Sequence, residues 1–413
     1  MNLISVKDFG AFGDADPLHV DYDTMAFQRA IEVAKDIGCS IVIPAGRYYI
    51  NEPLVYDTDD PDAQGLILFG EGMQSTTLVN VVDQEPLLSL IGGDSNSNKQ
   101  WGARLADFTI SKPEDGEGEF PSRPLPSRVT PIGDIELRCQ WHCDIERIRI
   151  QLAKGSGIRV VSRDRYVDPE TGQRGGGDHD SSAYLRFNNC WFGHSGGYGI
   201  HFDSKERTLG FSNVSIENCA ITGNTLGGIR GDGVGFFVVR NSGIGANGNE
   251  ESGHGGIYIS YNINNSQYLV VEECEIGNGN LPASIWLEGC IGGEISRNRF
   301  VLTDERKGIY IGHRPKLYVE DGVAKPAWGR ITSLACRQNW FVSAAFDREV
   351  DLPPSVYIAF DVSGPPDVDR LYIEKTYWGY SGGAFVSHPE SFIKLIQDRA
   401  AKVTFDEPIR LFH

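Results

Sequence analysis

Five segments between residues 185 and 313 repeat one pattern of apolar and polar positions. Each has an Asn-centred turn followed by a short strand in which apolar and polar residues alternate. One position is always isoleucine, with steps of 29, 28, 28 and 24 residues: Ile200, Ile229, Ile257, Ile285 and Ile309. A period of this length indicates stacked units, each covered by its neighbours. Because the alternation is that of strands, the segment predicts a parallel β-helix.

The first fifty residues predict a cap for this solenoid. Asp23 or Thr24 can begin a helix whose apolar positions recur at helical spacing. These positions are Met25, Phe27, Ile31, Val33 and Ala34. An amphipathic helix laid across the open end of a solenoid keeps water from its core.

No linker-like change of composition divides the 413 residues, so we expect one β-helix domain over residues 1–413. Its rungs extend over residues 66–388, after the cap and first strand at 1–50. Stretches rich in Pro, Gly and charge at 112–131 and 163–180 are expected to be loop insertions that could wall a cleft. Residues 389–413 are expected to form a C-terminal cap.

The formal net charge of −18 argues against a nucleic-acid or anionic-membrane partner, because both reward clustered Lys and Arg. A neutral or merely polar ligand fits better. Residues 1–10 lack the pattern of a signal peptide, and no apolar run is long enough to span a bilayer. We therefore expect a cytoplasmic protein, or a secreted one if the sequence is a mature form.

Three N-terminal stretches resemble the pectate-lyase-like superfamily of right-handed parallel β-helices: VKDFGAFGD, DTMAFQRAIEVA and VIPAGRYYI. The resemblance implies an all-β, single-stranded right-handed parallel β-helix with an N-terminal capping α-helix. It also implies a poly- or oligosaccharide ligand. Elongated members of this group often assemble side by side, so a homotrimer is expected. The resemblance does not fix a reaction, since the superfamily places its catalytic residues at different positions.

Eight cysteines raise the question of disulfides or metal ligands. Cys190, Cys219 and Cys274 follow the turn residue of their rungs, with Ser242 at the same place in the rung between. This spacing predicts an inward column of small apolar residues. Cys139, His142 and Cys143 are the only Cys/His cluster, and no second cluster completes a zinc site.

Aligning the rungs on isoleucine assigns every neighbouring side chain a face. Two outward columns result. The first is Arg159, His201, Arg230, Tyr258, Trp286, Tyr310 and Tyr357, and the second is Asp203, Asp232, Ser260, Glu288 and Gly312. Four aromatic side chains displayed outward predict a platform on which sugar rings stack, although strand propensity or an oligomer interface would also explain them.

The second column supplies the carboxyl pairs that glycoside hydrolysis uses. Asp203 and Asp232 would lie roughly 5 Å apart, and Asp232 and Glu288 nearer roughly 9.5 Å, which fit the retaining and inverting geometries respectively. We predict these three acids as catalytic residues. Alternatively they pair with Arg159 and Arg230, face water, or hold Ca²⁺. No cofactor is otherwise expected.

GHGGI at 253–257 is similar to a motif of the polygalacturonases, although the paired aspartates expected before it are missing. His254 is predicted to orient a carboxylate or a sugar hydroxyl. SIWLEGCIGGEISRNRF is similar to the inulin fructotransferases. The predicted function is therefore cleavage or transfer at a glycosidic bond, with six substrate-binding residues: His201, Arg230, His254, Tyr258, Trp286 and Tyr310.

Two other functions remain open. A polysaccharide lyase or uronate epimerase would use a base and a cation, and His201, Arg230 and Tyr258 could supply them, with or without Ca²⁺. A non-catalytic glycan-binding or phage tailspike-type adhesin would bind without cleaving.

Overall fold

The computed structural model divides the chain into two compact units, each described by itself. Unit 1 is Met1–Lys205 with Gly210–Thr225, and unit 2 is Glu206–Leu209 with Leu226–His413. The structure describes residues 2–58, 64–82, 85–92, 100–113, 132–162, 182–204, 210–249, 253–260, 267–277, 279–280, 282–302, 307–311, 316–320, 323–327, 330–343, 358–360, 367–368, 371–374, 377–380 and 403–405.

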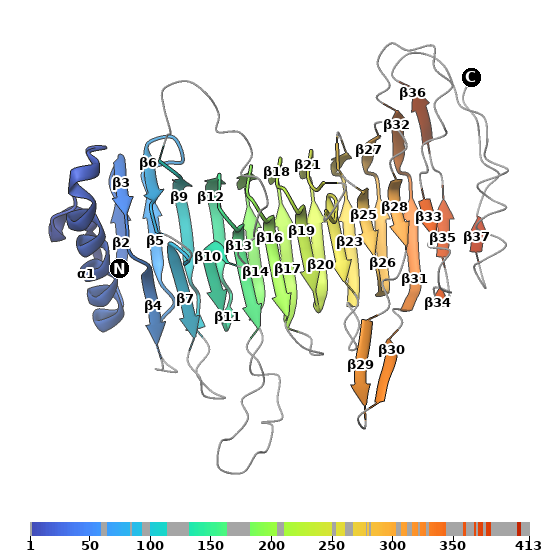
Figure 1. Ribbon diagram of the computed structural model, residues 1–413, viewed down its shortest axis with the longest axis horizontal. Coiled ribbons are helices and arrows are strands. Elements are labelled where there is room, and N and C mark those ends of the chain that lie inside the picture. Colours follow the sequence, from blue (N-terminus) through green and yellow to red (C-terminus); the bar gives the residue numbers. More distant parts are fainter. Residues whose placement is uncertain are drawn as a thin grey trace. The chain divides into compact units, whose positions relative to one another are not determined.

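Unit 1 has its helices near the N-terminus, after a short first strand, and continues as stacked parallel strands (Figure 1). Its helices are η1 (Val6–Phe9), η2 (Pro17–His19) and α1 (Val20–Ile37). One face is formed by β4 (Leu54–Thr58), β7 (Leu88–Gly92), β10 (Gly133–Arg138), β13 (Ser156–Ser162) and β16 (Tyr198–Ser204). The other faces are formed by β1 (Leu3–Ser5), β2 (Ser40–Ile43), β3 (Gly46–Ile50), β5 (Ile67–Gly70), β6 (Thr76–Asn80), β8 (Gln100–Trp101), β9 (Arg104–Ser111), β11 (Gln140–Trp141), β12 (Asp144–Gln151), β14 (Ser182–Asn188), β15 (Trp191–Gly193), β17 (Phe211–Glu217) and β18 (Ala220–Thr222).

Unit 2 repeats this arrangement. One face is formed by β19 (Gly227–Asp232), β22 (Ile257–Ser260), β25 (Ala283–Leu287), β28 (Lys307–Ile311) and β33 (Ile358–Phe360). The other faces are formed by β20 (Val234–Arg240), β21 (Gly243–Gly245), β23 (Gln267–Glu272), β24 (Glu275–Gly277), β26 (Cys290–Ser296), β27 (Arg299–Leu302), β31 (Arg330–Arg337), β32 (Trp340–Ser343), β34 (Asp367–Val368), β35 (Leu371–Glu374), β36 (Tyr377–Tyr380) and β37 (Val403–Phe405). An antiparallel hairpin, β29 (Lys316–Glu320) with β30 (Val323–Ala327), interrupts the parallel order.

The isoleucine period sets the strand register within each unit. In unit 1, Ile158 pairs with Ile200. In unit 2, Ile229, Ile257, Ile285 and Ile309 pair in succession. These side chains are fully buried, and burial of an isoleucine contributes roughly 1.5–3 kcal/mol. The predicted parallel β-helix is therefore confirmed.

The predicted Asn-centred turns occupy a left-handed backbone conformation. Their residues have φ between 49° and 56°: Asn189 and Asn218 in unit 1, and Asn241, Glu273, Arg297 and Gln338 in unit 2. Asn tolerates this conformation because its short polar side chain forms local hydrogen bonds, whereas for most other residues the conformation is energetically unfavourable. A residue with this conformation recurs at the same place in successive rungs, and it is Asn in three of these six.

The residue after each of these turns points inward and bonds to the backbone. Cys190 Sγ lies 3.3 Å from the Asn188 carbonyl oxygen, Ser242 Oγ 2.8 Å from that of Arg240, and Cys274 Sγ 3.2 Å from that of Glu272. Asn298 and Asn339 take the same place in later rungs. The predicted inward column exists, but its members are hydrogen-bond donors to carbonyls and not merely small apolar fillers.

We predicted that Asp23 or Thr24 begins the helix, and this was wrong. Helix α1 begins at Val20, so neither residue is its N-cap. Both are buried and attach the helix to the strands instead. The Asp23 carboxylate accepts hydrogen bonds from the backbone N–H groups of Phe12 and Tyr49 at 2.7 and 3.2 Å. Thr24 Oγ1 donates to Asn51 Oδ1 at 2.8 Å. The helix therefore does cap the unit, with Phe27 and Ile31 buried beneath it and Met25 exposed.

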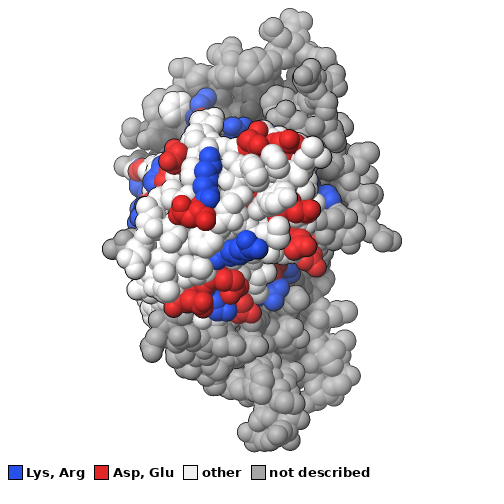
Figure 2. Space-filling view, turned by 90° about the vertical axis from the view of Figure 1, so that its left-hand side faces the viewer, with Lys and Arg blue, Asp and Glu red and all other residues white. Residues whose placement is uncertain are grey.

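Acidic and basic side chains are interspersed on the face of unit 1 seen in Figure 2, without a large patch of one sign. No described helix has the length and apolar character needed to cross a membrane.

Residues 114–131 and 163–181 and most of 389–413 lie outside the described residues. The predicted insertions, C-terminal cap and single domain stay predictions.

Replacing Asn298 by Ala should destabilise unit 2. Its Nδ2 donates to the Val271 carbonyl at 2.8 Å, and its Oδ1 accepts from the backbone N–H of Cys274 at 3.0 Å. Both groups would be left buried without a partner, which costs about 2–4 kcal/mol in total. Urea denaturation measures the loss. Asn241→Ala, at an exposed turn, should cost about 1 kcal/mol or less. Equal losses in the two variants would contradict this role of the inward column.

Candidate functional site

The candidate site lies on the outward side of β19, β22 and β25 in unit 2. The register places Arg230, Tyr258, Trp286 and Tyr310 side by side on successive strands, as the alignment on isoleucine predicts. The next outward positions are Asp232 and Ser260, which also pair. Glu288 follows directly after β25. Tyr357 and Gly312, which we had placed in these columns, lie outside the described residues, and the residue in register with Tyr310 is Ala359.

The aromatic column is not the exposed stacking platform that we predicted. Tyr258 and Trp286 are each only 4% exposed. Their rings meet edge to face with centroids 5.2 Å apart, and Trp286 meets Tyr310 in the same way. Strands in register are about 4.8 Å apart, so large rings on adjacent strands tilt and pack edge to face, which is a favourable arrangement that also covers them from solvent. The column is a packed wall behind the polar groups, with Tyr310 partly exposed.

Asp232 is a buried carboxylate held in place from two sides. Arg230 Nε donates to its Oδ2 at 2.7 Å, and the Ser260 hydroxyl donates to its Oδ1. The Asp232 side chain is 9% exposed, whereas the Arg230 side chain is 27% exposed. An adjacent guanidinium stabilises the ionised form of a buried carboxyl. Asp232 therefore has the environment of a proton acceptor.

Glu288 has a different environment. It is 1% exposed, and the Tyr258 hydroxyl is hydrogen-bonded to it. Burial first, and then the charge of Glu288, raise the pKa of Tyr258 well above its usual value. Tyr258 is consequently a hydrogen-bond donor at neutral pH and not a base. Burial in itself favours a neutral carboxyl, whereas the hydrogen bond from Tyr258 favours the ionised form, so the surroundings of Glu288 differ from those of Asp232.

His254 stacks on Tyr258, with ring centroids 4.3 Å apart and planes inclined by 28°. Two glycines put it there. A side chain at Gly253 would collide with the backbone of Asn249, and one at Gly255, with φ of +84°, would collide with the Ala283 carbonyl oxygen. The Gly-His-Gly sequence is thus explained by close backbone approach. His254 contacts the aromatic wall, and its predicted role toward substrate stays a prediction.

Unit 1 carries a second polar cluster, on β10, β13 and β16. Arg159 lies between two acids: its Nε donates to Asp203 Oδ2 at 3.0 Å and its Nη1 to Glu136 Oε2 at 3.2 Å. Arg138 Nε also donates to Glu136, at 2.7 Å. His201 is in register with Arg159, as predicted, and its ring lies 4.9 Å from that of Tyr198. Asp203 belongs to unit 1 and Asp232 to unit 2, so their predicted pairing stays a prediction.

Sequence reasoning missed three residues of this cluster, Asp134, Glu136 and Arg138. The signal was present, because they alternate with Ile135 and Leu137 on β10, which pair with Ile158 and Val160. Asp134 is fully buried, with Oδ1 accepting from Asn80 Nδ2 at 3.0 Å. None of the described residues hydrogen-bonds its Oδ2.

All eight cysteines are free thiols and buried. Of the possible metal cluster, Cys139 and Cys143 are in the core, whereas His142 is exposed and stacks on Tyr184 outside it. Strand alternation therefore separates the three residues onto two faces.

Two family models match the chain. Residues 3–111 match the model described as rhamnogalacturonase A/epimerase, pectate lyase-like, and residues 134–321 match the right-handed β-helix region. Together with the fold, these matches show a right-handed parallel β-helix protein whose residues 3–111 match the pectate-lyase-like model. The predicted handedness and superfamily are thus confirmed. A search of curated proteins finds no match.

Solved structures with the same fold include carbohydrate-active enzymes. The A-module of the mannuronan C-5 epimerase AlgE4 from Azotobacter vinelandii is 16% identical with a TM-score of 0.58, covering 98% of this chain and 100% of that one. The DFA-IIIase from Arthrobacter chlorophenolicus A6, in complex with DFA-III, is 10% identical with a TM-score of 0.60, covering 98% and 92%. At these identities the similarity establishes the fold. With the family matches it also supports a carbohydrate-related protein.

The buried Asp134 should make the stability of unit 1 depend on pH. Burial is the main cause that raises its pKa to about 6, from about 3.9 in an unfolded chain. The folded protein then binds the proton more tightly, so its stabilisation is complete below about pH 4. It is lost as the pH rises toward 6, by about 3 kcal/mol. Asp134→Asn, which keeps the acceptor for Asn80, should be more stable than the natural protein at pH 7.5 but not at pH 4.5.

Urea denaturation at the two pH values measures this difference. Asp144→Asn, at a half-exposed carboxylate of the same unit, is the control and should show no such gain at pH 7.5. If Asp134→Asn loses stability equally at both pH values, the buried carboxyl is not the titrating group.

Proposed function

We propose that the protein is a carbohydrate-active enzyme that cleaves or transfers at a glycosidic bond of a poly- or oligosaccharide. One observation carries the proposal: two buried carboxyls of unit 2 project from alternate rungs of the same face and have opposite environments. Asp232 is paired with Arg230, and Glu288 is enclosed beside Tyr258.

The spacing suits direct displacement by water. Asp232 is on β19 and Glu288 directly follows β25, with β22 between, so two strand spacings separate them by roughly 9–10 Å. Inverting glycosidases hold their two carboxyls about 6.5–9.5 Å apart, which leaves room for a water molecule. Glu288 would donate its proton to the leaving oxygen of the glycosidic bond. Asp232 would take a proton from the water that attacks the anomeric carbon.

The remaining predicted residues have supporting roles in this proposal. Arg230 keeps Asp232 ionised and oriented, and its partly exposed guanidinium can also bind a sugar hydroxyl. Tyr258 fixes the Glu288 side chain, while Trp286 and Tyr310 support Tyr258.

A lyase or epimerase is the second candidate, favoured by a cation beside an aromatic hydroxyl. The Arg230 guanidinium lies 5.6 Å from the centroid of the Tyr258 ring, and His254 stacks on that ring. Such an enzyme abstracts a proton next to a uronic carboxylate, which a cation must neutralise. The raised pKa of Tyr258 argues against it as the base, which leaves that role to a histidine.

Asp232→Asn and Glu288→Gln should each lower kcat by about 10²–10⁴-fold, the usual contribution of a general acid or base. The measurement is release of new reducing ends from a panel of neutral and acidic polysaccharides. Glu275→Gln is the matched control: Glu275 is also an Arg-paired acid of unit 2, but it is exposed and paired with Arg299. Full turnover by both site variants would sink the proposal.

Product chemistry separates the two candidate reactions. A lyase or epimerase should give an unsaturated product that absorbs in the ultraviolet, or an altered uronate configuration. If the reaction uses Ca²⁺, removing the ion with a chelator should abolish it. The proposed hydrolase or transferase should give neither product, and its activity should survive the chelator. Binding of glycan without any product would identify an adhesin.

A further inference from the structure

Unit 1 carries an aromatic stack outside the faces described so far. It runs across β8, β11 and β14 and consists of Trp101, His142 and Tyr184. The His142 ring is parallel to Tyr184, with an interplanar angle of 1° and centroids 4.5 Å apart. Trp101 stacks on His142 at 5.4 Å and 21°. Unlike Tyr258 and Trp286, the two outer rings remain 45% exposed.

Tyr184 is the end of this stack. It has a left-handed backbone, with φ of +55°, and its side chain is exposed. The register of β14 with β17 places Asn213 beside it on the next rung, also at positive φ. Asn213 is much smaller than a ring, so the stack ends in a step. His142 and Trp101 support the Tyr184 ring from behind, and a ring already fixed in place loses little entropy when it binds.

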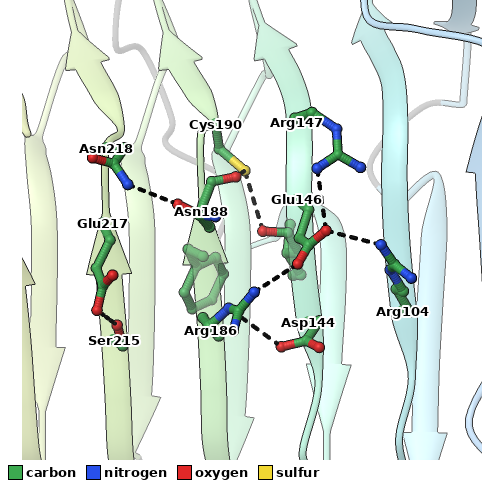
Figure 3. A network of polar contacts seen from close by, with 12 residues as sticks. Arg104, Asp144, Glu146, Arg147, Arg186, Asn188, Cys190, Ser215, Glu217 and Asn218 are labelled. Carbon is green, nitrogen blue, oxygen red and sulfur yellow. Dashed lines mark hydrogen bonds and ion pairs between the residues drawn. The ribbon is translucent and has the colours of Figure 1, made fainter.

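Polar groups accompany the step. Arg186 lies two residues after Tyr184 on β14, and it is in register with Ser215 on β17. Figure 3 shows Arg186 donating to Glu146, at 2.7 Å, beside Asp144, and Ser215 donating to Glu217, at 2.6 Å. The Arg186 side chain is 49% exposed, so its remaining N–H groups can reach a ligand.

The charges around Glu146 balance. Arg104 and Arg186 are positive, Asp144 and Glu146 are negative, and each arginine is bonded to Glu146. The pair of Arg147 with Asp107 also balances. A strongly anionic ligand therefore gains little here. An aromatic face beside planar polar groups without net charge is the complement of a neutral sugar ring, whose C–H face packs on aromatic carbon while its hydroxyls bond to Arg and Ser.

The exposed ring area is too small for a stable contact between protein chains. Tyr184 and Trp101 together expose roughly 200 Å², whereas a stable protein interface buries about 800 Å² on each partner. A second copy of the chain is thus the less suitable occupant.

We propose that the Tyr184 step is a non-catalytic binding site for a neutral sugar unit of a polysaccharide. The ring would stack on Tyr184 above Asn213, and Arg186 and Ser215 would bind its hydroxyls. The site takes its ligand class from the proposed function, but it does not need the reaction to occur.

Unit 2 offers a matched control for this proposal. Tyr268 occupies the equivalent position, with φ of +51° and 49% exposure. The residue two positions along its strand, however, is Val270, and the residues in register with Val270 are Val238 and Glu294. No guanidinium stands in the place of Arg186, so Tyr268 is not expected to hold a sugar as Tyr184 does.

The test measures retardation of the full-length protein in gels that contain inulin, laminarin or galactomannan, all neutral polysaccharides. Tyr184→Asn should weaken binding of at least one of them by about tenfold or more. Asn213 already occupies the corresponding position of the next rung with nearly the same φ, so the fold should tolerate Asn at position 184. Tyr184→Phe keeps the ring and should bind nearly as well as the natural protein, as should Tyr268→Asn.

Three results would overturn the proposal: no retardation of the natural protein by any of the three, equal loss in Tyr184→Asn and Tyr268→Asn, or a changed oligomeric state of Tyr184→Asn by light scattering. Failure of the proposed reaction is recognised separately. In that case no polysaccharide yields new reducing ends, yet Tyr184→Asn still loses retardation.

Discussion

The fold depends on a chain turn at the same place in every rung, so that each strand lies in register with the one before it. Two adjacent residues achieve this. The first takes a left-handed backbone, as Asn189 and Asn241 do, and the second points inward and bonds to a backbone carbonyl, as Cys190 and Ser242 do. Without the second residue the corner would bury polar backbone groups that have no partner, which costs more than the hydrogen bond itself contributes.

The same constraint decides what the outer columns can be. Because the register is fixed, side chains at one position stand about 4.8 Å apart, close enough to form ion pairs and stacks but too close for large rings to remain separate. Tyr258 and Trp286 therefore cover each other. At Tyr184 the small Asn213 beside it leaves the stack with an exposed end. At this end of the stack, the small neighbour on the next rung leaves one side of the Tyr184 ring uncovered.

This explains which features the sequence could predict. Isoleucine recurrence gave both the fold and the face of each residue, since period and alternation are properties of the chain itself. Burial depends on neighbours, so alternation correctly turned Trp286 outward but could not show that it is covered. Other misses had visible signals. In the sequence, Asp-Gly between two strand-like runs is a typical signal for a hairpin, and this dipeptide lies between the residues of β29 and those of β30. The alternation at Asp134 and Glu136 matched that of later rungs.

The acids of the candidate site illustrate the limit of position as a guide to chemistry. Asp232 and Glu288 occupy the same outward position on different rungs, so the sequence does not distinguish them. Their surroundings differ, because Arg230 and Ser260 bind Asp232, whereas Glu288 is buried beside Tyr258. Acid–base catalysis needs such a difference, since two carboxyls with the same proton affinity cannot serve as donor and acceptor at one pH. In the proposed reaction, Arg230 beside Asp232 and the burial of Glu288 beside Tyr258 would supply this difference.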